Sequence, residues 1–122
     1  MGAARANPER EICGLLLGRD QDVLEVCVAE NIADRPDKRF EIDPAILIGA
    51  HKAARNGGIS VLGHYHSHPD GMCEPSAYDA DMALDEGALW LICTADGRYS
   101  LWRAGREGVQ GCFAKVDMHI VE

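Results

Sequence analysis

The sequence predicts one α/β or α+β domain built on a mixed β-sheet, and three observations point to this. Short apolar runs bounded by glycine indicate buried strands. Two longer segments open with helix-capping residues and indicate helices. The strands and helices are ordered so that both hairpin and crossover connections occur, which requires antiparallel and parallel pairs in one sheet. The chain of 122 residues suits one core, and we expect residues 1–122 to form a single domain.

The first half of the chain is expected to contain two strands and a helix. The run ICGLLLG (residues 12–18) is too short for a helix and reads as a buried strand, and the β-branched segment at 23–32 is the second strand. A turn at RPDK (35–38) and a short extended piece, RFEID, follow. Asp43 and Pro44 then cap and start a helix that stops at Gly57 and Gly58.

The second half is expected to contain a third strand, a second helix and three more strands. ISVLGHY (59–65) is the third strand, and Pro75 and Ser76 begin a helix with the sequence SAYDADMALDEGA. The remaining strands are predicted at 89–94, at 98–103 and near 113–121, with turns at the D-G and A-G pairs between them.

Composition excludes several classes of protein. The net charge of −8, with no compensating Lys/Arg cluster, disfavours a nucleic-acid partner. No apolar run approaches the roughly 18 residues of a membrane span, and the N-terminal residues do not resemble a secretory signal. Five scattered cysteines without a C-x-x-C pair fit a reducing cytoplasm rather than a disulfide framework or a cysteine zinc cluster.

Three of the five histidines lie in the segment GHYHSHP (63–69). Because side chains alternate along an extended chain, His64, His66 and His68 point to one face at intervals of about 7 Å. Adjacent members can therefore converge on one ion, since Zn–N bonds measure about 2.0–2.1 Å. We expect His64 to face a neighbouring pocket or solvent, although it could close the coordination of a metal.

Asp79 has two interpretations that differ in where its side chain points. Ser76 and Asp79 form the S-x-x-D pattern of a helix capping box, in which both side chains bond to amides of the first turn. Alternatively, two histidines and this carboxylate make the three-ligand set of a catalytic zinc, which leaves a fourth position for water. A hydrolase also needs a carboxylate to carry the proton. Glu9, Glu11, Glu74 and Asp81 are the candidates from their positions.

Three segments of the sequence resemble the motifs of a known family. His66-Ser67-His68, seven residues, Ser76, two residues and Asp79 match the H-S-H-x7-S-x2-D motif of the JAMM, or MPN-plus, metalloproteases. PEREICGLLLG is similar to the first strand of that family, in which the pattern E-x-C-G selects Glu11 over Glu9. NIADRPDKRFEIDP resembles the segment that runs from an asparagine to F-x-I-D-P. The resemblance covers nearly the whole chain from residue 8.

The resemblance implies a cytidine-deaminase-like α/β fold with a curved mixed sheet and two or three helices. It implies one Zn²⁺ per chain, held by His66, His68 and Asp79, with Glu11 as general base and then acid. Ser76 would hydrogen-bond the oxyanion, and Ser67 would hold the loop between the ligands. The implied substrates are amide bonds that follow the C-terminal tail of a ubiquitin-like or sulfur-carrier protein. The long insertions of eukaryotic members are absent, which favours the compact prokaryote-like branch.

Two other functions remain open from the sequence. A non-catalytic MPN-type interaction scaffold would use the same fold, and a peptidoglycan-type amide hydrolase would use the same site. A nucleobase deaminase needs H-x-E and P-C-x-x-C, and neither motif occurs. The oligomeric state is not predicted by any of these patterns.

Overall fold

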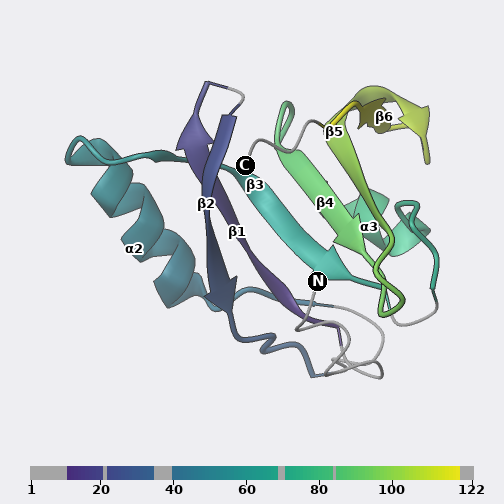
Figure 1. The fold of residues 1–122 in the computed structure, drawn as a ribbon, viewed down its shortest axis with the longest axis horizontal. Coiled ribbons are helices and arrows are strands. Elements are labelled where there is room, and N and C mark those ends of the chain that lie inside the picture. The colour runs from purple at the N-terminus through teal and green to yellow at the C-terminus, as the bar shows by residue number, and fades with distance from the viewer. Residues whose placement is uncertain (1–10, 21, 35–39, 69–70, 84, 119–122) are drawn as a thin grey trace.

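The computed structural model describes residues 11–20, 22–34, 40–68, 71–83 and 85–118, and these form one six-stranded sheet with two helices (Figure 1). None of the helices in these ranges is long and apolar enough to cross a membrane. The elements in chain order are β1 (Cys13–Arg19), β2 (Asp22–Ala29), α2 (Pro44–Arg55), β3 (Ser60–Ser67), α3 (Ala77–Met82), β4 (Leu89–Cys93), β5 (Tyr99–Val109) and β6 (Phe113–Val116).

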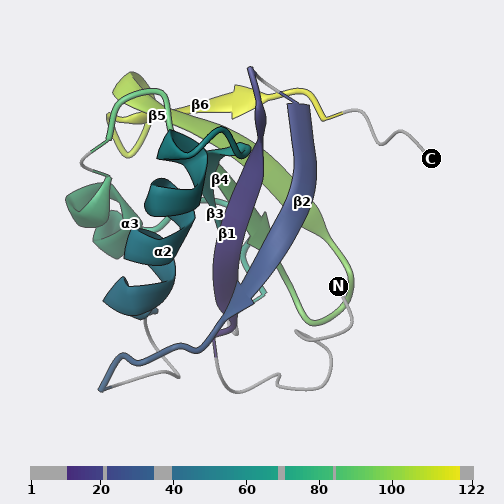
Figure 2. The same cartoon turned by 90° about the vertical axis from the view of Figure 1, so that its left-hand side faces the viewer.

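The sheet is mixed, as predicted. Its strand order is β2-β1-β3-β4-β5-β6, and β3 and β4 are its parallel pair, while the other neighbours are antiparallel. The connection between β3 and β4 contains α3, which is the crossover that a parallel pair requires. Both helices lie on the same side of the sheet, with α2 against β3 and α3 beside β4 (Figure 2).

The sheet register places the start of β1 beside the end of β3. Cys13 pairs with His66, and Leu15 pairs with His64. Directly paired residues point to the same face of a sheet, so these side chains lie on one face. The residues just before Cys13 therefore lie next to the segment in which the histidines stand.

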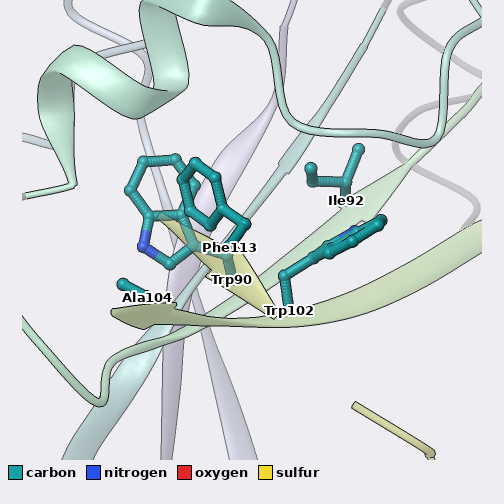
Figure 3. Packing of buried hydrophobic residues seen from close by; sticks show 5 residues of the cluster. All are labelled: Trp90, Ile92, Trp102, Ala104 and Phe113. Carbon is teal, nitrogen blue, oxygen red and sulfur yellow. The ribbon is translucent and has the colours of Figure 1, made fainter. Parts of the chain in front are cut away.

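Two apolar clusters pack on the two faces of the sheet. On the helix side, strands β4, β5 and β6 contribute a cluster (Figure 3), and Ala80 of α3 and Ala83, just after that helix, pack against it. Its buried members are Trp90, Ile92, Trp102, Ala104 and Phe113. On the opposite side, Tyr65 and Leu16 pack with Leu89 and Leu91. Trp90, Trp102 and Tyr65 are thus core residues.

The predicted helix at Asp43 is confirmed. The Asp43 carboxylate accepts a hydrogen bond from the Ala45 N–H at 2.9 Å, and Pro44 occupies the first turn. Asn56 caps the end of the helix, and Gly57 continues in the left-handed region with φ of 92°. The helix therefore begins at its predicted cap, Asp43, and ends just before the predicted glycine, Gly57.

The structure corrects the predicted second helix, which is shorter than the sequence pattern indicates. Helix α3 has six residues and ends before Ala83, instead of running to residue 88. Tertiary pairing outweighs helix propensity here, because the N–H of Gly87 bonds to the Ala104 carbonyl at 2.8 Å and turns the chain into β4.

The predicted turn at Ala104-Gly105 is also wrong. Both residues lie inside β5, and the hairpin to β6 turns instead at Gln110 and Gly111, which have φ of 56° and 79°. The expected turn at Asp96-Gly97 is present, with Gly97 at φ of 90°. Strand β3 ends two residues later than predicted, at Ser67, and begins one residue later, at Ser60, whereas β2 ends earlier, at Ala29. The expected turn at 35–38 and the segment 119–121 lie outside the described residues.

Candidate metal centre

Two imidazole rings at the end of β3 converge on one point. The Nε2 atoms of His66 and His68 are 3.0 Å apart, and both rings are buried. Asp79 lies against both rings, with Oδ1 3.3 Å from His66 Nε2 and Oδ2 3.0 Å from His68 Nε2. Ligands bound to a tetrahedral zinc at about 2.0–2.1 Å lie roughly 3.3 Å from one another. The three side chains therefore have the spacing that such an ion requires.

The first turn of α3 positions Asp79 by a capping box. Asp79 Oδ2 accepts from the Ser76 N–H at 2.9 Å, and Ser76 Oγ accepts from the Asp79 N–H at 3.1 Å. The two interpretations of Asp79 that the sequence left open thus hold together, because the same carboxylate bonds its own helix start and faces the histidines. Only 2% of Asp79 is exposed.

The ring orientation of His68 is fixed by a main-chain carbonyl. Its Nδ1 lies 2.8 Å from the Met72 carbonyl oxygen, and a carbonyl can only accept. Nδ1 therefore carries a hydrogen, and Nε2, on the side of His66 and Asp79, is the ring nitrogen that can bind a cation. This arrangement, in which the second ring nitrogen donates to a carbonyl, is typical of histidines that bind metals. The Met72 carbonyl was not identified from the sequence, since a main-chain group has no sequence pattern.

The His66 ring is held by stacking. Phe40 lies parallel to it, with ring centroids 4.3 Å apart and an interplanar angle of 16°. The buried Nδ1 of His66 has no hydrogen-bond partner among the described residues. Phe40 is a site residue that the sequence analysis did not single out, although it is the first letter of the F-x-I-D-P segment.

Burial and the neighbouring charges shift the pKa values of Asp79 and His68 in opposite directions. Burial raises the pKa of Asp79, but the hydrogen bonds from His66 and His68 outweigh it and hold this pKa well below its ordinary value. Burial lowers the pKa of His66. Burial also lowers the pKa of His68, yet the hydrogen bond and charge of Asp79 leave that pKa raised overall. The carboxylate therefore stays ionised and His66 stays neutral, which are the forms that bind a metal cation. Asp79 favours the protonated form of His68, whose Nε2 proton a metal cation would displace.

Glu11, which lies just before β1, also faces His66 and His68 at the end of β3. One ligand atom each of Glu11, His66 and His68 lie within 4.8 Å of one another, and Glu11 is 4% exposed. Asp79 is not a member of that group, and contacts the two rings separately at 3.0 and 3.3 Å. Two carboxylates thus face one imidazole pair, with Asp79 at 3.0 and 3.3 Å and Glu11 within 4.8 Å.

Ser67 connects the histidine strand to the segment that carries Glu11. Its Oγ accepts from the Ile12 N–H at 2.8 Å, and its own N–H donates to the Ile12 carbonyl at 3.0 Å. The sequence analysis expected Ser67 to hold the loop between the ligands. In the structure it joins β3 to the start of β1, one residue after Glu11.

The other candidate side chains lie apart from this group. Glu74 and Asp81 are exposed, and Glu9 lies outside the described residues. His64 faces a neighbouring cleft of about 600 Å³, between α2 and the start of β4. This agrees with the expectation that His64 faces a pocket beside the histidine pair. Burial lowers the pKa of His64 to about 3. His51, on α2, is exposed.

The residues present fit a catalytic zinc. Two imidazoles and one carboxylate are ligands that zinc accepts, and three protein ligands leave one position open. Two imidazole nitrogens and an ionised carboxylate lie close together in a buried site. A cation between them best balances the negative charge.

Comparison with known proteins agrees with this reading of the fold. The family model described as prokaryotic homologues of the JAB domain matches residues 1–105, and the chain belongs to this family. It is 38% identical over 98 residues to the desampylase of Haloferax volcanii, and 33% identical over 92 residues to that of Pyrococcus furiosus. These matches cover 78% and 75% of this chain, and 70% and 65% of those proteins.

A third relative is a probable TtuB-protein conjugate cleaving protease from Thermus thermophilus, 39% identical over 70 residues. That match covers 57% of this chain and 47% of the relative. Among solved structures, a protein from Desulfitobacterium hafniense has a TM-score of 0.80 and 29% identity over 99% of this chain and 85% of its own. A structure described as a JAMM metalloprotease-like zinc site has a TM-score of 0.59 and 19% identity, over 99% and 86%. The chain therefore has the JAMM/MPN fold.

Proposed function

We propose that this chain is a zinc-dependent isopeptidase that hydrolyses the amide bond following the C-terminal tail of a ubiquitin-like or sulfur-carrier protein. The observation that carries the proposal is the convergence of His66, His68 and Asp79 on one point, with Glu11 facing the same histidine pair. The desampylases and the conjugate-cleaving protease among its relatives support this substrate class.

His66, His68 and Asp79 are the proposed ligands of a single Zn²⁺. When bound, the zinc polarises a carbonyl and lowers the pKa of a water molecule to about 7. The Met72 carbonyl keeps the lone pair of His68 Nε2 directed at the metal position. Asp79 is assigned as the ligand, rather than Glu11, because it lies in direct contact with both rings.

Glu11 is proposed to move the protons. Its buried carboxylate takes the proton of the attacking water and delivers it to the leaving amine. A carboxylate oxygen of Glu11 lies within 4.8 Å of the ring nitrogens, so it is near the position at which the water would react. Ser76 accepts a hydrogen bond from Asp79, so its hydroxyl hydrogen is available to donate to the oxygen that gains negative charge.

The test compares Glu11→Gln with Glu74→Gln, a matched change at an exposed glutamate of the neighbouring loop. The substrate is a Gly-Gly-ending carrier protein joined by an amide to a fluorogenic amine. We expect Glu11→Gln to retain one zinc per chain and lose at least about 100-fold in kcat, because only the proton carrier is removed. Glu74→Gln is expected to behave like the wild type.

Two results contradict the proposal. Turnover of Glu11→Gln at the wild-type rate would move the proton carrier to another residue. Failure of the fully zinc-loaded wild type to cleave any Gly-Gly carrier would remove the substrate class altogether.

A further inference from the structure

Asn31 is a buried polar residue just beyond the end of β2, and its side chain makes three hydrogen bonds to main-chain groups of the described residues. Its Oδ1 accepts from the N–H groups of Ala33 and Glu41, each at 3.0 Å. Its Nδ2 donates to the main-chain carbonyl of Glu11 at 2.8 Å. Asn31 is 5% exposed, so these bonds are shielded from water.

The hydrogen-bond partners determine the orientation of the Asn31 side-chain amide. Two N–H groups face one end and a carbonyl faces the other, so a flipped amide would set donor against donor and acceptor against acceptor. Only a side chain with an acceptor and a donor on one planar group meets both requirements at this position.

The three bonds connect segments on two sides of the candidate metal centre. One is the segment that carries Glu11. The other is the segment of Glu41, which follows Phe40, whose ring stacks on His66. The Ile32 N–H also donates to the Glu41 carbonyl at 2.9 Å, and Asn31 pairs with Ile42 in an isolated bridge. Asn31 thus joins the base segment to the segment that packs on a proposed zinc ligand.

Glu11 lies just before the paired part of the sheet. The paired registers of β1 with β2 and with β3 both begin at Cys13. Ser67 holds Ile12, but the main chain of Glu11 lies one residue further out. The hydrogen bond from Asn31 extends the fixed part of the chain to Glu11 itself.

We propose that Asn31 is a positioning residue that holds the Glu11 main chain so that the carboxylate faces the histidine pair. This inference rests on the proposed function, because it concerns the residue to which proton transfer is assigned. A displacement of about 1 Å in a reacting group can cost roughly 100-fold in rate, so the anchor bears directly on turnover.

The test uses Asn31→Asp in the zinc-loaded protein with the fluorogenic Gly-Gly carrier. The aspartate retains the shape and both acceptor contacts, but sets an oxygen against the Glu11 carbonyl. We expect kcat to fall by about 10- to 100-fold, KM to stay within about twofold and zinc content to be unchanged. Asn56→Asp, the same change at the exposed end of α2, is the matched control and should leave kcat unaltered.

A double-mutant cycle separates positioning from general stability. In the Glu11→Gln background, Asn31→Asp should cause no further loss of the residual rate, because the group it positions is already absent. If Asn31→Asp does not fold, Asn31→Ala replaces it in the same cycle, since it introduces no buried charge.

The inference is overturned if Asn31→Asp retains the wild-type kcat, if its effect persists in the Glu11→Gln background, or if neither variant folds. These outcomes leave the proposed function intact as long as the wild type cleaves the carrier. A wild type that cleaves nothing removes both proposals.

Discussion

At the scale of single residues, Asp79 combines two tasks in one carboxylate. Oδ2 completes the capping box and also contacts His68, while Oδ1 contacts His66. The helix cap fixes the rotamer before any metal arrives, so less conformational freedom is lost on binding. The low pKa of this carboxyl follows from the same bonds.

Asp79→Asn provides a test of the ligand role. Asparagine keeps the shape and an oxygen for the Ser76 N–H, but it loses the charge and one acceptor. We expect zinc affinity to fall by more than the roughly 10- to 100-fold that is usual for residues behind the ligands. Competition with a chromophoric chelator measures this affinity. Asp81→Asn, at an exposed position of the same helix, is the control, and equal zinc affinity in the two variants would contradict the ligand assignment.

At the scale of elements, the loop between the ligands is fastened to β5. The Ser100 hydroxyl donates to the Cys73 carbonyl, and accepts from the Trp102 indole N–H at 2.7 Å. The Arg98 guanidinium donates to the Gly71 carbonyl at 2.6 Å. The loop that leads from His68 to α3 therefore depends on a strand outside the site.

Ser100→Ala tests this attachment. It leaves a buried indole N–H and the Cys73 carbonyl without their shared partner, which should cost about 1–3 kcal/mol of unfolding free energy. Urea denaturation followed by Trp fluorescence measures the loss. Ser60→Ala, at the exposed start of β3, should change stability by less than about 0.5 kcal/mol. A similar effect of the two substitutions would show that the loop does not depend on Ser100.

An element could be predicted from the sequence when the residues that fix its ends are close to it in the chain. Helix α2 could be predicted because Asp43, Pro44 and Gly57 act within a few residues of the chain. The end of α3 and the length of β5 could not, because they depend on pairing between residues 87 and 104, which no local pattern records. The resemblance to the family motif implied the five proposed site residues, whereas spacing alone left Asp79 with two interpretations and the proton carrier with four candidates. Phe40 and the Met72 carbonyl were missed, since stacking and main-chain contacts become visible only in three dimensions.

At the scale of the whole molecule, the candidate metal centre joins the end of β3 to the start of α3, with Glu11 just before β1 facing it. A ligand that binds the folded chain alone stabilises it by RT ln(1 + [L]/Kd), or about 2.7 kcal/mol at a hundredfold excess over Kd. For a chain of this size, that corresponds to a rise in Tm on the order of 10 °C.

Zinc removal should therefore destabilise the protein. We expect EDTA treatment to lower Tm by this amount and zinc to restore it, as followed by differential scanning calorimetry. Magnesium at the same concentration should have no effect, because it prefers oxygen ligands in octahedral geometry. Equal Tm for the EDTA-treated and zinc-loaded forms would argue against a metal that binds the native state.

The proposed ligands and the proposed base come from very different distances along the chain. His68 and Asp79 are 11 positions apart, whereas the contact that brings the Glu11 segment to the histidine strand spans 55 positions between Ile12 and Ser67. Closing a longer loop costs more entropy, so the coordinating half of the site is the easier half to assemble. A partly folded chain that has brought only β3 and α3 together would then bind zinc while leaving amide bonds untouched.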